Sequence, residues 1–278
     1  MRDLAQSTPE RLFRCALAAA LACACAKPDA GAPVFGGQGA VVDPGSRAAA
    51  VEAQPARGPC DLPAPASEDA RLDDFEDGDN RLFGGFEREG WWFTATDHTQ
   101  GATVFPPDGK FEATKLGAEG TVDNQFAAHL TGSGFTDWGI SWGVTLHHVG
   151  ASAKCPLNAG NFAGIRLRAR GKGTILMRFG MPETTAAEFG GSCTEKCWDL
   201  HTYVLRLTDD WQTREIRWDQ LQQGGWGKSA RFDPRRLLSL QFAAKPEYLP
   251  ADVWLDDLEW LRAAPAASGG AVPAAPKG

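Results

Sequence analysis

The sequence lacks the short motifs that mark common catalytic and nucleotide-binding sites. It contains no G-x-S-x-G elbow, H-E-x-x-H helix, P-loop or dinucleotide fingerprint. Its five histidines are scattered, apart from a His147-His148 pair that fits the end of a strand better than a site. Basic residues form no cluster, and the net charge is −7 with a pI near 5.3. These absences argue against nucleic acid binding and favour no known class of catalyst.

The chain also lacks an apolar run long enough to cross a bilayer as a helix, which takes about 20 residues. The longest such run near the N-terminus is CALAAALACACA, from Cys15 to Ala26, and it follows Arg2, Arg11 and Arg14. A basic segment before a short apolar run of small residues predicts an export signal over residues 1–25. The mature protein is therefore expected in the cell envelope or outside the cell.

The end of that run resembles a bacterial lipobox, because Ala-Cys occurs at both Cys23 and Cys25. The resemblance implies that one of these cysteines is lipidated and becomes the new N-terminus. Acyl chains would hold the protein on the outer membrane or cell surface without crossing it. Plain secretion is the alternative.

Export makes disulfides the first interpretation of the remaining cysteines. After Cys15 is removed with the signal and Cys23 or Cys25 is lipidated, an even set is left, with three possible pairings: Cys60, Cys155, Cys193 and Cys197. The pairing of Cys193 with Cys197 in GGSCTEKCWDLH is the most economical, and it leaves Cys60 for Cys155. The segment is then a tied loop, although a metal site using Asp199 and His201 stays open.

Between two segments rich in Ala, Pro and Gly lies a region with a period of two. Residues 26–70 predict a flexible linker and residues 263–278 a disordered tail, since neither carries apolar periodicity. Within residues 71–262, short alternating runs such as FAGIRLRAR and LHTYVLRL are separated by Gly, Pro and Asp clusters. No repeat is apparent, and only DQLQQ and PRRLLSL suggest a helical turn. The pattern predicts an all-β domain, a sandwich or barrel.

Several segments of this domain together resemble galactose-binding-like jelly rolls, especially family 11 carbohydrate-binding modules and related domains of bacterial lipoproteins. The segments are LDDFEDGDN, GFTDWGISWGVTL, FAGIRLRARGKG and DVWLDDLEWL, in that order. The resemblance implies a jelly-roll β-sandwich. Related lipoprotein domains carry a Gly-Gly-x-Cys…Cys-x-Asp-His loop, which GGSCTEKCWDLH resembles, with Asp199 and His201 two residues apart.

Acidic residues cluster at both ends of the domain, in LDDFED and in DDLE. The first and last strands of a jelly roll can run side by side, so the two clusters are expected to meet. Ca²⁺ prefers such oxygen ligands. The resemblance implies a structural calcium ion and nominates Asp74, Glu76 and Asp257, with solvated charge at strand ends as the alternative.

Tryptophan is common, with ten residues in the chain. Trp218, Trp254 and Trp260 lie in strand runs and are expected in the core. Four others lie among Gly and polar residues and are candidates for stacking on sugar rings: Trp138, Trp142, Trp198 and Trp226. Polar side chains near the tied loop are candidate partners of sugar hydroxyls: Arg178, Asp199 and His201.

These observations favour a surface-tethered, non-catalytic polysaccharide-binding protein, expected to be a monomer. One alternative is an envelope lipoprotein whose sandwich is a structural or protein-interaction module without a glycan ligand. The other is an enzyme that cleaves glycosides, which would need a close pair of carboxylates in a cleft.

Overall fold

The computed structural model describes Cys60 and residues 70–83, 90–149 and 153–263. All of them belong to one unit, which spans 54–278. The expected signal peptide, the linker apart from Cys60 and Ala70, and the tail apart from Ala263 lie outside the described residues. No helix in the described part is long and apolar enough to cross a membrane.

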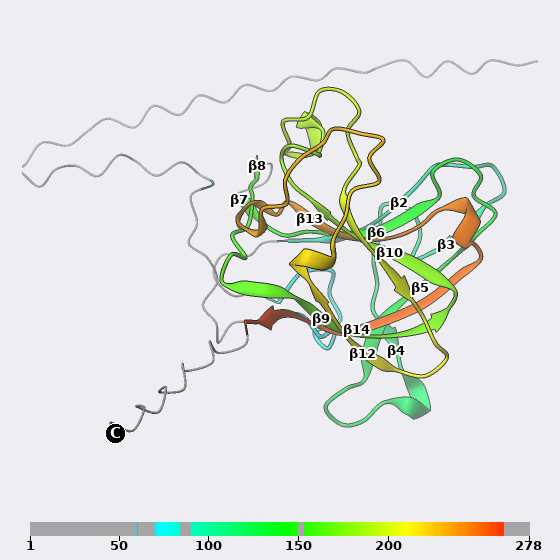
Figure 1. Ribbon diagram of the computed structural model, residues 1–278. Helices are drawn as coiled ribbons and strands as arrows, with labels where there is room; N and C mark the ends of the chain where they lie inside the picture. Colours follow the sequence, from blue (N-terminus) through cyan, green and yellow to red (C-terminus); the bar gives the residue numbers. More distant parts are fainter. Residues whose placement is uncertain (1–59, 61–69, 84–89, 150–152, 264–278) are drawn as a thin grey trace, which may run out of the picture. The chain divides into compact units, whose positions relative to one another are not determined.

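The described residues form an all-β structure without an α-helix, as the alternation predicted (Figure 1). Sheet one contains β1 (Arg71–Asp73), β3 (Thr103–Phe105), β4 (Thr114–Lys115), β5 (Phe126–Ser133), β9 (Phe162–Lys172), β12 (Gln212–Arg217) and β14 (Ala251–Arg262). Sheet two contains β2 (Trp92–Thr96), β6 (Ile140–Thr145), β10 (Thr174–Gly180), β11 (His201–Arg206) and β13 (Ser239–Ala244). β7 (His148–Val149) and β8 (Ala153–Lys154) pair as a hairpin.

Short 3₁₀ turns connect some of the strands. They are η1 (Gly117–Glu119), η2 (Ala187–Phe189), η3 (Trp218–Gln220), η4 (Pro234–Arg236) and η5 (Pro246–Tyr248). η3 and η4 occupy the two segments in which the sequence suggested a helical turn.

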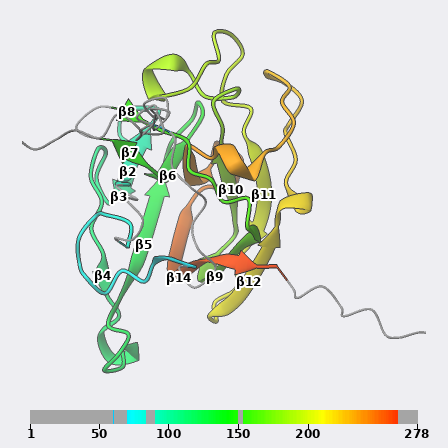
Figure 2. The same cartoon turned by 90° about the vertical axis from the view of Figure 1, so that its left-hand side faces the viewer.

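The strand order is that of a jelly roll. Sheet one runs β12-β9-β14-β5-β3, and sheet two runs β11-β10-β13-β6-β2, with all of these neighbours antiparallel. Most successive strands from β5 to β14 therefore cross between two packed sheets, so that β14 returns between β5 and β9. The turned view shows β9, β12 and β14 in one layer (Figure 2). The predicted jelly-roll sandwich is confirmed.

The core lies between the inner faces of the two sheets. Ile165, Leu167 and Ala169 are buried on β9, while the arginines between them face outward, as the period of two predicted. Trp260 is buried as expected, and Trp218 packs against the core. The prediction that Trp254 lies in the core is wrong. Trp254 pairs with Arg170 on β9 and lies on the outer face of sheet one, because its neighbours Val253 and Leu255 take the inner positions.

The first and last strands run side by side, which confirms that the two acidic segments meet. In β1, Arg71 pairs with Glu259 and Asp73 with Leu258 on β14. Asp73 is buried and accepts hydrogen bonds from the Trp92 indole at 2.6 Å and the Phe75 amide at 2.8 Å. Burial nevertheless raises the pKa of Asp73 to about 7.

We predict that the domain loses stability as the pH rises through the raised pKa of Asp73. Between its ordinary value of 3.8 and about 7, the folded state binds more protons than the unfolded chain, so the stabilisation is complete at low pH and is lost as the pH rises. Burial raises the pKa of Asp256 to about 6, which acts in the same direction. Urea titrations should give a free energy of unfolding that declines from about pH 4 to about pH 7.

In Asp73→Asn the decline should be shallower, because only Asp256 then contributes. The comparison uses the pH slope, so a constant destabilisation by the amide does not affect it. Identical slopes in the two proteins would contradict the assignment to Asp73.

Candidate functional site

A groove of about 470 Å³ lies on the outer face of sheet two, where β10 and β11 meet the loops that follow them. Arg178 and Leu176 face it from β10, while Ile175, Met177 and Phe179 between them point into the core. The lining residues come from four segments and are Leu176, Arg178, Trp198, Asp199, Leu200, Thr202, Tyr203, Val204, Gln220, Gln222, Gln223, Gly224, Trp226, Lys245 and Tyr248. Four of them are predicted site residues: Trp198, Trp226, Arg178 and Asp199.

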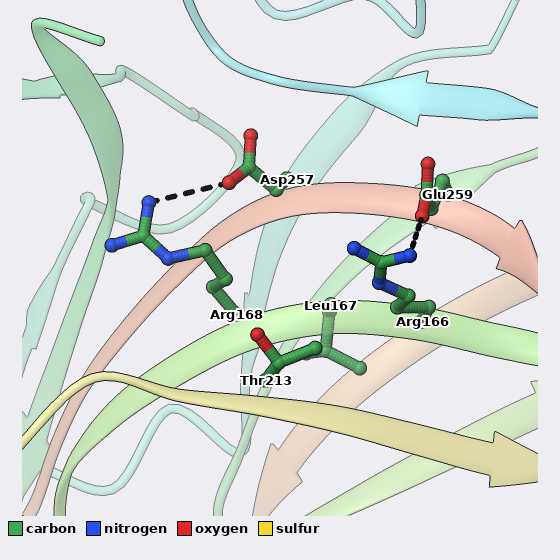
Figure 3. Close-up of a pocket in the computed structure, with 6 residues that line it drawn as sticks. All are labelled: Arg166, Leu167, Arg168, Thr213, Asp257 and Glu259. Carbon is green, nitrogen blue, oxygen red and sulfur yellow. Dashed lines mark hydrogen bonds and ion pairs between the residues drawn. The ribbon is translucent and has the colours of Figure 1, made fainter.

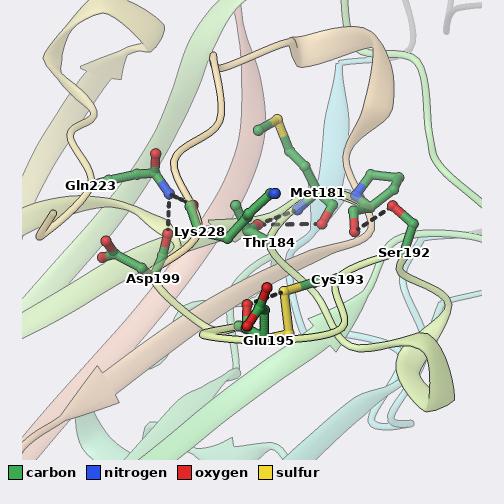
Figure 4. Close-up of a disulfide and its surroundings, with 10 residues drawn as sticks. Met181, Thr184, Ser192, Cys193, Glu195, Asp199, Gln223 and Lys228 are labelled. Atoms are coloured by element: carbon green, nitrogen blue, oxygen red, sulfur yellow. Dashed lines mark hydrogen bonds between the residues drawn. A yellow bond between two sulfur atoms is a disulfide. The ribbon is translucent and has the colours of Figure 1, made fainter. Parts of the chain in front are cut away.

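Both predicted disulfides are present, Cys193–Cys197 and Cys60–Cys155. Cys193–Cys197 ties the long connection between β10 and β11, which lies beside the groove (Figure 4). The predicted tied loop is therefore confirmed, and these two cysteines are not free to bind a metal.

The tied loop fixes Trp198 in an unusual backbone conformation. Trp198 has φ +76° and Lys196 has φ +50°, in the left-handed region that bulky residues avoid at about 1–3 kcal/mol each. The Trp198 amide donates to the Thr184 carbonyl at 2.8 Å, and its carbonyl accepts from Arg178 at 2.6 Å. The indole edge packs on Phe189 at a centroid distance of 5.1 Å. These contacts hold a strained tryptophan at the groove wall.

Asp199 joins the tied loop to the loop that carries Trp226. Its carboxylate accepts three backbone N–H groups, from Gly224 at 2.7 Å, Gly225 at 2.8 Å and Gly227 at 3.1 Å. The Gln223 side-chain amide adds a contact between the two loops, because it donates to the Asp199 carbonyl at 2.5 Å (Figure 4). Asp199 was predicted to bind sugar hydroxyls, but its buried carboxylate is occupied by amides, so its observed role is to position the second wall.

Arg178 is half-buried in the groove. Burial lowers its pKa to about 10, against the opposing effect of the nearby Asp199 charge. The side chain therefore stays cationic at neutral pH. Of its five N–H donors, one contacts a described residue, the Trp198 carbonyl. The remaining donors are available to a ligand or to water.

Two predicted sugar contacts are wrong, because strand alternation turns them inward. Trp142 is fully buried on β6, where it pairs with Phe242 and Thr94 in the core. Its glycine and polar neighbours suggested an exposed ring in or near a loop, but Trp142 lies within β6 with its side chain turned inward. His201 is also buried, on the same side of sheet two as its β10 partner Phe179, and it packs on Phe232 at 5.1 Å. Burial lowers the pKa of His201, which keeps the ring neutral.

Trp138 is exposed, as predicted, but it does not line the groove. It lies in the turn between β5 and β6, and the adjacent Gly139 approaches Ala244 and Lys245. Of the seven predicted sugar-binding residues, the structure thus brings together Trp198, Trp226, Arg178 and Asp199.

Sequence reasoning missed the tyrosines and glutamines of the groove. The chain has two tyrosines, Tyr203 and Tyr248, and both line it. So do the amides of Gln220, Gln222 and Gln223. A signal for the glutamines was available, because QLQQ concentrates three neutral side chains that each donate and accept hydrogen bonds. Both tyrosines also pack against the core, and Tyr203 shares the inner face with its partner Met177.

The predicted calcium ligands do not form one cluster. Asp74 pairs with Arg71 at 2.8 Å, and Glu76 accepts the Gln125 and Phe126 amides at 2.8–3.0 Å. Asp257 pairs with Arg168 at 3.2 Å in a shallow pocket on sheet one (Figure 3). Among the described residues, no group of three or more His, Cys, Asp or Glu side chains is arranged to hold a metal ion. These three residues do not fit a shared calcium site, and calcium binding stays a prediction.

Comparisons with known proteins return carbohydrate-active relatives. No family model matches the chain. Over 217 residues the chain is 28% identical to endoglucanase 3 of Fibrobacter succinogenes (strain ATCC 19169 / S85), covering 74% of this chain and 29% of that protein. The chain thus spans less than a third of this relative.

The solved structures that resemble the chain include carbohydrate-binding modules. A family 11 module from Clostridium thermocellum, in complex with a β-1,3-1,4-mixed-linked tetrasaccharide, has 16% identity and a TM-score of 0.45, covering 70% of this chain and 95% of that one. A family 30 module has 15% identity and a TM-score of 0.42, covering 65% and 86%.

We predict that Asp199→Ala frees the loop that carries Trp226. Each charge-assisted hydrogen bond stabilises by about 1.5–3 kcal/mol, so amide hydrogen exchange at Gly224, Gly225 and Gly227 should speed up by about 10- to 100-fold. Asp219→Ala is the control, since Asp219 is exposed and its only ion pair within the described part of the chain is with Arg217, at 3.9 Å. Unchanged exchange at the three glycines would show that the carboxylate does not hold the loop.

Proposed function

We propose that this domain binds a polysaccharide in the groove of sheet two and does not cleave it. The observation that carries the proposal is the combination of three aromatic side chains in one groove: Trp198, Trp226 and Tyr248. Trp226 is 58% exposed, which leaves its indole open to a ligand. A flat apolar ring with one polar atom suits the C–H face of a sugar and the hydroxyls at its edge.

Neutral hydrogen-bonding groups accompany the aromatic rings. Gln220, Gln222 and Thr202 line the groove and offer both donors and acceptors. The groove volume of about 470 Å³ is within the range of ligand sites, about 300–1,000 Å³. Fixing Trp198 and Trp226 before binding reduces the conformational entropy that a ligand must overcome. These properties support recognition of an uncharged sugar face by stacking and hydrogen bonds.

The groove supports binding better than hydrolysis. Glycosidases use two carboxyl groups about 5–10 Å apart. Among the described residues, Asp199 is the only carboxylate that lines this groove, and both of its oxygens accept backbone amides. The related endoglucanase is more than three times as long as the matched segment, since the chain covers 29% of it. We infer that the resemblance concerns a polysaccharide-binding part of that protein.

We further propose that the domain is held at the bacterial surface by a lipid on Cys23 or Cys25. The support is the sequence pattern alone, because both cysteines lie outside the described residues. Residues 26–70 would then be the linker between the anchor and β1.

Lipidation predicts a membrane-associated mature chain that begins at Cys23 or Cys25. Mass spectrometry of the N-terminal peptide from the membrane fraction should find diacylated or triacylated cysteine. A mature chain that is unmodified and recovered without detergent would instead support plain secretion.

Trp198→Ala and Trp226→Ala should each weaken polysaccharide binding by about 10- to 100-fold. The estimate takes about 1–3 kcal/mol per stacked ring from base–aromatic stacking, with 1.4 kcal/mol per factor of ten. Affinity electrophoresis in soluble β-glucans and xylans measures the change. Trp211→Ala is the matched control, because this indole packs on Arg168 and Arg170 at the outer face of sheet one.

We expect a binding glycan in the gel to slow the migration of the wild type and of the Trp211→Ala control. It should slow the two groove variants much less. If no glycan retards the wild type, the domain is better explained as a structural or protein-interaction module. If the groove variants bind normally but unfold at lower temperature, the two indoles are packing residues.

A further inference from the structure

The groove carries an excess of positive charge in an acidic protein. Three charged side chains line it: Arg178, Lys245 and Asp199. The Asp199 charge attracts Arg178 from a distance, but its carboxylate is held by three backbone amides and forms no ion pair with Arg178. The chain as a whole has a net charge of −7. A cationic groove on such a protein is therefore a local feature and does not follow from composition.

Neither groove cation has an ion-pair partner among the described residues. Other arginines of the domain do: Arg166 pairs with Glu259 at 3.1 Å and Arg170 with Glu119 at 2.6 Å. Arg178 instead donates to one backbone carbonyl. Lys245 is exposed at the segment that leads into η5. Burial of Arg178 is only partly compensated by the Asp199 charge, which forms no ion pair with it, so a ligand carboxylate in direct contact would stabilise the guanidinium further.

The positions beside Arg178 on sheet two do not supply a counter-charge. Its in-register partners are Thr202 on β11 and Gln241 on β13, and both are neutral. The Thr202 hydroxyl donates to the Leu200 carbonyl at 2.8 Å, and Gln241 is engaged with Ser141 and Ser239 at 3.3 Å. The guanidinium is thus the strongest donor on this part of the groove floor.

We propose that the ligand of the groove is an acidic polysaccharide, one with uronic acid residues, and that a sugar carboxylate binds Arg178. The planar guanidinium matches a carboxylate in a bidentate geometry that a neutral hydroxyl cannot reproduce. Lys245 adds a second, solvent-exposed attraction for the same polyanion. This inference rests on the proposed function, since it names the class of glycan that the aromatic walls would hold.

The test compares each acidic polymer with its own carboxyl-reduced form, which has the same backbone without the charge. Isothermal titration calorimetry would use polygalacturonate, alginate and glucuronoxylan. We expect at least one acidic polymer to bind about tenfold more tightly than its reduced form, because a charge-assisted hydrogen bond contributes more than a neutral one. The difference should shrink as salt rises from about 0.02 M to about 0.3 M.

Substitutions of the two groove cations test whether the preference for the acidic polymer arises in the groove. Arg178→Lys keeps the charge but loses the bidentate fork, and it should lose most of the preference for the acidic form. Lys245→Gln removes an exposed charge with no ion-pair partner among the described residues, so it should fold normally and weaken only the acidic polymer, by about two- to fivefold. Arg206→Gln is the control, since Arg206 is an exposed cation on β11 that does not line the groove.

The outcomes separate this inference from the proposed function. Equal binding of acidic and reduced polymers, unaffected by Arg178→Lys and Lys245→Gln, would overturn the charge preference and leave polysaccharide binding intact. An equal loss in Arg206→Gln would show a general charge effect and would also overturn it. If no polymer of either kind binds, the proposed function itself fails.

Discussion

The groove depends on one buried carboxylate. Asp199 follows Trp198 in the tied loop and accepts the amides of the glycine-rich loop that carries Trp226. The two loops are also joined by the Lys228 amide, which donates to the Lys196 carbonyl at 2.7 Å. A carboxylate can satisfy several backbone donors at once, and within the loop Gln223 adds hydrogen bonds to Lys228 at 2.8 Å and to Ala230 at 2.9 Å. The distance between the two walls of the groove is therefore set by Asp199.

The Cys193–Cys197 disulfide contributes more to the conformation of the tied loop than to the stability of the domain. Closing a loop as short as Cys193–Cys197 stabilises the fold by only about 2 kcal/mol in the chain-entropy model. Two left-handed residues in the same loop cost about 2–6 kcal/mol together. The disulfide thus offsets part of the strain that places Trp198 at the groove wall. The sheet provides the floor and the stability, and the loops provide the geometry.

Local sequence patterns predicted the elements of this fold, and prediction failed where the face of a strand had to be chosen. Alternation indicated the sandwich, export indicated both disulfides, and proximity to the tied loop identified Trp198, Arg178 and Asp199. Trp142 was misassigned because its small neighbours suggested an exposed ring near a loop. Small residues also fit a strand beneath large side chains, as where Phe93 lies over Gly143. Tyr248 was missed because the return of β13 beside β10 brings it to the groove, and this pairing is not local in sequence.

The two outer faces of the sandwich use the same residue types to opposite effect. On sheet one, Arg170 lies between Trp211 and Trp254 at 4.9 and 5.0 Å, and Trp254 stacks on His129 at 3.9 Å. This row runs across the sheet from the start of β12 to β5. Arg170 forms an ion pair with Glu119, and His129 forms a hydrogen bond with Asp252. On sheet two the rings are separated by a groove, and the cations beside them lack such partners among the described residues. Aromatic and basic side chains that form cation–π contacts with one another stabilise a sheet. Those that a rigid backbone holds apart are available to a ligand.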